Sequence, residues 1–160
     1  MQSFASEVVS IADSCLGGLQ KRSALLIGPE AQRLPYTALL QRAGMACVYQ
    51  ESTPLHVAHI LPHVQLLMSL PEPSHATPLL TAATVAQGCL GRRTPLLIFD
   101  LADSTSVEEL VGLLPAVCLY TPEDMHRILS RVEIKGAFHF FAPRMEVVKY
   151  REKTRRETRA

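Results

Sequence analysis

Short, continuous apolar runs alternate along this chain with longer segments in which apolar residues recur at helical spacing. Runs of four to eight apolar residues without polar alternation are typical of strands in a parallel sheet that is covered on both faces. Five such runs predict strands at residues 23–27, 45–49, 64–70, 95–101 and 116–120. Helical spacing predicts helices at residues 4–19, 35–43, 56–61 and 79–90, and another after residue 121.

This alternation predicts the α/β class: a doubly wound, mostly parallel five-stranded sheet with helices on both faces, as in Rossmann-like folds. We expect the strand order 3-2-1-4-5. Residues 1–143 would form this domain, and residues 144–160 a basic C-terminal helix or tail. The length suits one domain with its own core.

Three local signals predict where helices begin. Ser106 and Glu109 have the spacing of a capping box for a short helix. Thr121 is expected to cap the last helix, with Pro122 at its first position. Pro35 is poorly tolerated inside a helix, so the helix after the first strand is predicted to begin near it.

The composition restricts location and partners. The net charge is +1, so the whole molecule is no polyanion binder, although residues 149–160 hold six of the sixteen Lys and Arg. That basic end could contact RNA or another acidic partner, but a solvated helix end is the simpler interpretation. The chain begins without a secretory signal, and no apolar stretch reaches the roughly eighteen residues of a membrane span. We therefore expect a cytoplasmic protein that binds neither membrane nor DNA. Its isolated cysteines are predicted to be reduced core thiols: Cys15, Cys47, Cys89 and Cys118.

The turn after the first strand is the candidate nucleotide site. In doubly wound folds a glycine-rich turn lets the next helix point its N-terminus at a pyrophosphate. Here Gly28 is followed by Pro29, which lacks a backbone donor, and by Glu30, which adds bulk and negative charge. Arg33 is the local cation that could offset Glu30. This turn is unfavourable for a dinucleotide, and Gly28 could simply end the strand.

The second strand ends at Gln50 and Glu51. An acid about twenty residues past the glycine turn usually accepts from a ribose 2′-hydroxyl, which favours NAD over NADP. A solvated glutamate at a strand end is the alternative. Asp100 and Asp103 lie at the carboxyl end of the fourth strand, where such folds bind ligands.

Residues 91–129 (GRRTPLLIFDLADSTSVEEL, then VGLLPAVCLYTPEDMHRIL) resemble the end of the nucleotide-binding domain of glutamyl-tRNA reductases, which start tetrapyrrole synthesis in many bacteria and plants. The resemblance covers roughly residues 5–131 and is most specific in its second half. Of the family's glycines in the first turn only Gly28 remains. Gln50 and Glu51 replace an Asn-Arg pair suited to the 2′-phosphate of NADP.

This resemblance implies a link to haem or sirohaem synthesis and two hypotheses of function. The first is a degenerate scaffold or interaction module that contacts a protein partner or a second copy. The second is the NAD- or NADP-binding part of an active reductase that works with a separate catalytic domain, in which Gly28, Arg33, Gln50 and Glu51 would line the cofactor. We expect the family's catalytic domain and its cysteine nucleophile to be missing, so the isolated chain would be inactive and would meet tRNA only indirectly.

A third hypothesis rests on three histidines. His56, His59 and His63 have the spacing of one helix face and could hold a metal ion or a haem iron. Pro62 interrupts that helix, and surface histidines are the simpler interpretation. No paired nucleophile and base, and so no catalytic residue, is recognisable in the sequence.

Overall fold

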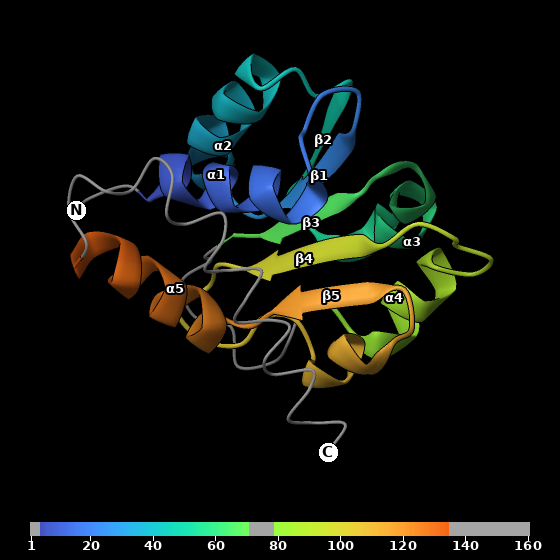
Figure 1. The fold of residues 1–160 in the computed structure, drawn as a ribbon. Coiled ribbons are helices and arrows are strands. Elements are labelled where there is room, and N and C mark those ends of the chain that lie inside the picture. Colours follow the sequence, from blue (N-terminus) through green and yellow to red (C-terminus); the bar gives the residue numbers. More distant parts are fainter. Residues whose placement is uncertain (1–3, 71–78, 135–160) are drawn as a thin grey trace.

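The computed structural model describes residues 4–70 and 79–134, and within them a five-stranded sheet lies between two layers of helices (Figure 1). All its strand pairings are parallel. The predicted α/β class is therefore confirmed, whereas the predicted tail at 144–160 lies outside the described residues. The strands are β1 Ser23–Ile27, β2 Cys47–Glu51, β3 Leu66–Ser69, β4 Leu96–Asp100 and β5 Val117–Tyr120. The helices are α1 Ala5–Leu16, α2 Glu30–Arg42, α3 Val57–Ile60, α4 Ala82–Gly88 and α5 Pro122–Ile134, with 3-10 turns η1 Pro54–His56, η2 Leu61–His63 and η3 Glu109–Leu113.

The strand order is β2-β1-β3-β4-β5, so the predicted order 3-2-1-4-5 is wrong. All four residues of β3 are buried, and β3 pairs with β1 on one side and β4 on the other. In β2, by contrast, Cys47 and Gln50 are exposed. A fully buried strand is stabilised by neighbours on both sides, which gives β3 the interior position and leaves β2 at the edge.

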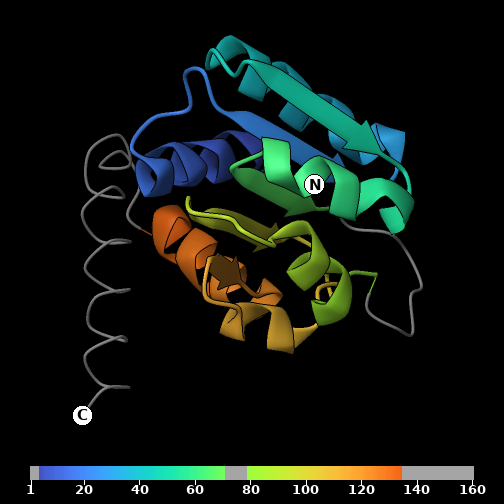
Figure 2. The same ribbon diagram turned by 90° about the vertical axis from the view of Figure 1, so that its right-hand side faces the viewer.

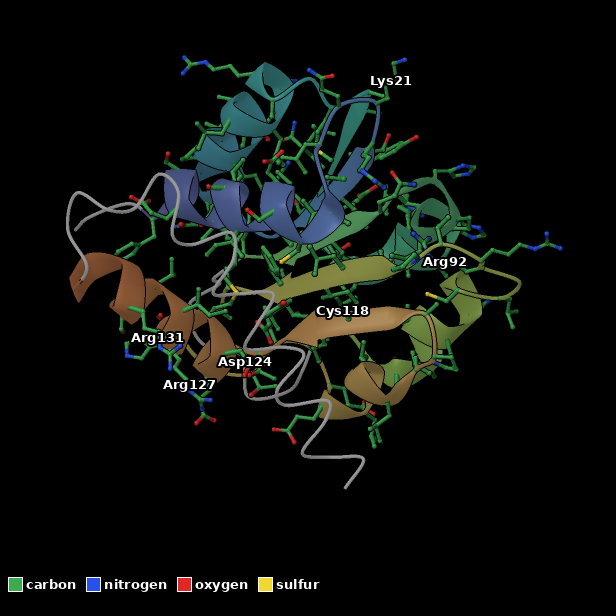
Figure 3. All side chains as sticks on the ribbon, viewed as in Figure 1. Lys21, Arg92, Cys118, Asp124, Arg127 and Arg131 are labelled. Atoms are coloured by element: carbon green, nitrogen blue, oxygen red, sulfur yellow. The ribbon has the colours of Figure 1, made fainter. Side chains whose placement is uncertain are left out.

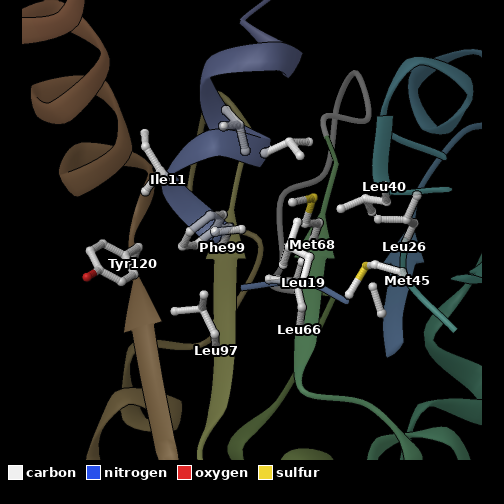
Figure 4. Packing of buried hydrophobic residues seen from close by; sticks show 14 of the residues in the cluster. Ile11, Leu19, Leu26, Leu40, Met45, Leu66, Met68, Leu97, Phe99 and Tyr120 are labelled. Carbon is white, nitrogen blue, oxygen red and sulfur yellow. The ribbon is translucent and has the colours of Figure 1, made fainter. Parts of the chain in front are cut away.

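Successive side chains along each strand enter different layers of the core. Leu26 and Phe99 pack with α1, α2 and α5 on one face, whereas Leu25 and Ile98 pack with α3, α4 and η3 on the other. Figure 4 shows the first layer, where Ile11 of α1 lies over Phe99 and Tyr120. The Phe99 and Tyr120 rings meet edge to face with centroids 5.2 Å apart. Figure 2 shows the sheet from its end, with helices on both sides of it.

Helix α2 begins at Glu30, five residues before the predicted start at Pro35. Its buried residues Arg33, Thr37 and Leu40 are spaced i, i+4 and i+7, so one continuous face runs past the exposed Pro35. Pro35 removes one backbone hydrogen bond near the helix start. Burial of this face therefore outweighs the local cost of the proline.

The C-terminal end of α1 and the start of α5 agree with the expectations from the sequence. Gly17 ends α1 in the left-handed conformation with φ 68°. Before α5, the Asp124 backbone N–H donates to the Thr121 hydroxyl over 3.1 Å, and the Thr121 N–H donates to the Asp124 carboxylate over 3.0 Å. This reciprocal pair is a capping box.

Among the described residues, no helix combines the length and the apolar character that a membrane span requires.

Candidate nucleotide site

The candidate site lies where the chain reverses its direction across the sheet. β2 and β3 lie on opposite sides of β1, so the switch point of this fold is between β1 and β3. Doubly wound folds bind ligands outside the carboxyl ends of the strands at such a point. Here the β1 end is tied to both neighbours: Gly28 N–H donates to the Glu51 carbonyl over 3.0 Å, and Leu70 N–H donates to the Ile27 carbonyl over 2.8 Å.

Gly28 has a structural reason to be glycine. Its φ is 141°, and a Cβ at this position would lie 3.0 Å from the Leu70 Cβ and 3.2 Å from the Leu70 carbonyl oxygen. The close approach that glycine allows here is therefore to the end of β3. In a dinucleotide-binding turn the corresponding glycine lets the backbone approach the pyrophosphate.

The N-terminus of α2 offers few donors for a phosphate. Pro29 precedes the helix and has no N–H, while the N–H groups of Gln32 and Arg33 both donate to the Pro29 carbonyl, over 3.0 and 3.1 Å. Helix geometry leaves the N–H groups of Glu30 and Ala31 for a ligand. The exposed Glu30 carboxylate stands at the same end of the helix, where it opposes a second anion by like-charge repulsion.

Arg33 crosses from α2 to the end of β2. Its Nε donates to the Gly28 carbonyl over 2.8 Å, its Nη1 to the Gln50 side-chain oxygen over 3.0 Å, and its Nη2 to the Ser52 hydroxyl over 3.4 Å. These hydrogen bonds bring Gly28, Arg33 and Gln50 together. Glu51 contributes its backbone carbonyl, which accepts a hydrogen bond from the Gly28 N–H. Cofactor binding by the four residues stays a prediction.

A second polar network, which the sequence pattern did not reveal, lies at the ends of β3 and β4. Asp100 is buried, and its carboxylate accepts from the Ser106 hydroxyl over 2.6 Å and from the N–H groups of Ser106 and Val107 over 2.8 and 2.9 Å. The Ser106 hydroxyl also lies 2.7 Å from the Ser69 hydroxyl. The predicted capping box of Ser106 with Glu109 is therefore wrong: Ser106 binds Asp100 and Ser69, and η3 begins at Glu109 itself.

The histidines do not form the predicted continuous helix face. His56, His59 and His63 fall in η1, α3 and η2 respectively, and all three are exposed. In residues 4–70 and 79–134 no three His, Cys, Asp or Glu side chains lie together as a metal site would require. Pro62 lies in η2 and ends the α-helical turn, which divides the three residues among separate turns.

The four cysteines are free thiols, but the prediction that all lie in the core is wrong for Cys47. Cys47 is exposed because β2 is an edge strand. A hydrogen bond with Cys47 raises the pKa of the Tyr49 phenol. The Cys15 thiol is half-buried and lies 3.7 Å from the Tyr120 hydroxyl.

Two further groups have shifted pKa values away from the switch point. Burial, assisted by the nearby Glu7 carboxylate, raises the pKa of Tyr36 to about 12. Burial lowers the pKa of Arg92, whose guanidinium donates to the carbonyls of Leu61, over 2.7 Å, and Val64. Arg92 precedes β4, at the amino ends of the strands (Figure 3). Its role there is structural, because it joins the turn before β4 to the turn before β3.

Known glutamyl-tRNA reductases resemble this chain in sequence, although no family model matches it. It is 28% identical over 145 residues to the glutamyl-tRNA reductase of Stutzerimonas stutzeri, which covers 80% of this chain and 34% of the relative. It is 27% identical over 149 residues to that of Methanospirillum hungatei, covering 79% and 35%. The chain therefore spans about a third of the length of the curated relatives it matches.

Solved structures agree on the fold. The glutamyl-tRNA reductase from Methanopyrus kandleri matches with a TM-score of 0.67 and 20% identity, covering 98% of this chain and 45% of that one. A dipicolinate synthase chain from Bacillus halodurans matches with a TM-score of 0.56 and 12% identity, covering 82% and 53%. The fold defines a Rossmann-like domain, and the turn after β1 lies at its switch point. Within that class, the chain is partially homologous to glutamyl-tRNA reductase.

Proposed function

We propose that this Rossmann domain is a non-catalytic interaction module of tetrapyrrole synthesis. The partial homology to glutamyl-tRNA reductase supports this choice of pathway. The module would contact another protein of that pathway or a second copy of itself. Its fold would have been retained for these contacts while the cofactor turn diverged.

The observation that carries this proposal is the turn from Gly28 to Arg33. Leu70 occupies the space beside Gly28, Pro29 supplies no donor, and Glu30 adds an exposed carboxylate at the start of α2. Each of these features disfavours a pyrophosphate. A domain selected to hold a dinucleotide would be expected to keep donors and small residues here.

A calorimetric titration of the full chain with NADPH and, separately, with NADH tests the proposal. We expect neither nucleotide to bind with micromolar affinity, because Glu30 repels the pyrophosphate. Glu30→Gly should not change the stability of the fold greatly, since Glu30 is exposed. Micromolar binding by the unaltered chain would overturn the proposal.

The cofactor-binding part of an active reductase is the second candidate, because Gly28, Arg33 and Gln50 do converge at the end of β1 and β2. The two candidates differ in chemistry as well as in affinity. Mixed with glutamyl-tRNA and NADPH, a reductase component would restore aldehyde formation to a separately produced catalytic domain. We expect no such restoration from an interaction module.

A further inference from the structure

Glu7 of α1 carries a carboxylate oxygen that is not satisfied within residues 4–70 and 79–134. Its Oε2 is buried and has no hydrogen-bond partner there, although the side chain as a whole is only half-buried. The nearby group on α2 is the Tyr36 phenol, which stays neutral at pH 7 because burial and the Glu7 carboxylate raise its pKa to about 12. A carboxylate oxygen that neither water nor a donor reaches is costly, so a cation bound at this point would be favoured.

Other acids in the part of the chain that the structure describes gain less from a cation. The Asp100 carboxylate is buried but already accepts from backbone N–H groups. Glu30 and Glu123 are exposed, so water solvates them, and Glu123 also pairs with Arg127. The buried oxygen of Glu7 gains most from a new donor, because it gives up no water in accepting one.

The sequence contains a concentrated source of cations in residues 149–160. This segment (KYREKTRRETRA) lies outside the described residues and carries six Lys and Arg against two Glu. Helix α1, by contrast, contains Glu7 and Asp13 and no Lys or Arg. The segment and α1 are therefore complementary in charge.

The path of the chain brings this segment within reach of α1. Helix α5 packs against α1, and Figure 1 shows the end of α5 and the start of α1 on the same side of the molecule. From Ile134, the last residue of α5, the chain to residue 149 can span up to about 50 Å. A tether of this kind gives an effective concentration on the order of millimolar, so even a weak ion pair can form.

We propose that residues 149–160 bind to α1 of the same chain, with a Lys or Arg of the segment paired with Glu7. The aliphatic stem of that side chain covers the half-buried rings of Phe4, one turn before Glu7, and Tyr36. The basic segment, for which the sequence left RNA or another acidic partner open, thus has an acidic partner in its own chain. This contact goes beyond the proposed interaction role and does not depend on it.

Trypsin cleavage of the full chain tests the contact, because trypsin cuts after Lys and Arg and the contact shields those of residues 149–160. Mass spectrometry follows the release of fragments from the segment, and cleavage after the exposed Arg93 normalises the rates for any change in the stability of the fold. Glu7→Gln should accelerate the release about twofold to fivefold, the effect of losing one partly exposed ion pair. Glu30→Gln is the matched control, since Glu30 is exposed at the start of α2, and it should change nothing. No acceleration by Glu7→Gln, or equal acceleration in both variants, would overturn the inference.

A measurement on the unaltered chain locates the segment and identifies the copy to which it belongs. A carbodiimide joins carboxylates to amines in direct contact, and mass spectrometry identifies the products formed in a mixture of isotopically labelled and unlabelled chains. We expect Lys149 or Lys153 linked to Glu7 within one isotopic form and in preference to Glu30. Links that favour Glu30 would overturn the inference. Links that join labelled to unlabelled chains would assign the contact to a second copy and overturn its same-chain form.

Discussion

At the scale of single residues, Asp100 shows how much one buried carboxylate can organise. It accepts from the Ser106 hydroxyl and from three backbone N–H groups, those of Ala102, Ser106 and Val107. These residues belong to the segment between β4 and η3, which has no helix or strand of its own. The carboxylate therefore substitutes for the regular hydrogen bonds that this segment lacks.

We predict that Asp100→Asn destabilises the domain by about 2–4 kcal/mol, since charge-assisted hydrogen bonds are lost and the new amide N–H₂ faces buried donors. Urea unfolding followed by circular dichroism measures the change. Asp103→Asn is the control, because Asp103 is exposed and should be nearly neutral. Equal effects of the two substitutions would show that the network does not hold the turn.

Tyr36 gives a second prediction at the residue scale. Its folded-state pKa is about 12, above the ordinary value of 10.0. A group with a raised folded-state pKa contributes stability that is present below its unfolded pKa and lost as the pH rises through the folded one. We therefore expect stability to fall between pH 10 and 12, with a smaller fall in Tyr36→Phe. An absorbance titration at alkaline pH should also lose, in that variant, a phenol that ionises near pH 12.

At the scale of elements, α2 contains a conflict between local and long-range preferences. Pro35 lies inside the helix but is exposed, and Thr37 donates to the Arg33 carbonyl over 3.0 Å within the same stretch. The burial of Arg33, Thr37 and Leu40 holds the helix together through the proline. A prediction from helix propensity alone places the start of α2 too late, because propensity does not include the burial of this face.

Pro35→Ala should stabilise the domain by about 1–2 kcal/mol, because the restored backbone hydrogen bond exceeds the added entropy of the unfolded chain. Thermal unfolding measures the gain. Pro54→Ala is the matched control: Pro54 is the first residue of η1, where no hydrogen bond is lost, and its replacement should not stabilise. A gain shared by both variants would contradict the explanation.

At the scale of the whole molecule, the sequence predicted the strands and helices that depend on local pattern. It missed the contacts between residues that are distant in the chain. The strands were found because each is a continuous apolar run, and the α5 start because its two signals, Thr121 and Pro122, are adjacent in the sequence. Ser106 was misassigned because its partners include Ser69, 37 residues away. Arg33 was identified by its charge, but its contacts with Gln50 and Ser52 depend on how β2 packs beside β1.

The strand order gives the last prediction. With β3 between β1 and β4, its amides should exchange with solvent only in global unfolding, whereas the amides of the edge strand β2 should exchange through smaller openings. Native-state hydrogen exchange under weakly denaturing conditions measures both. The reverse result, slow exchange in Cys47–Glu51 and fast exchange in Leu66–Ser69, is what the order 3-2-1-4-5 would produce, since that order places β3 at the edge and β2 inside. Hydrogen exchange in β2 and β3 therefore distinguishes the strand order expected from the sequence from the order that burial favours.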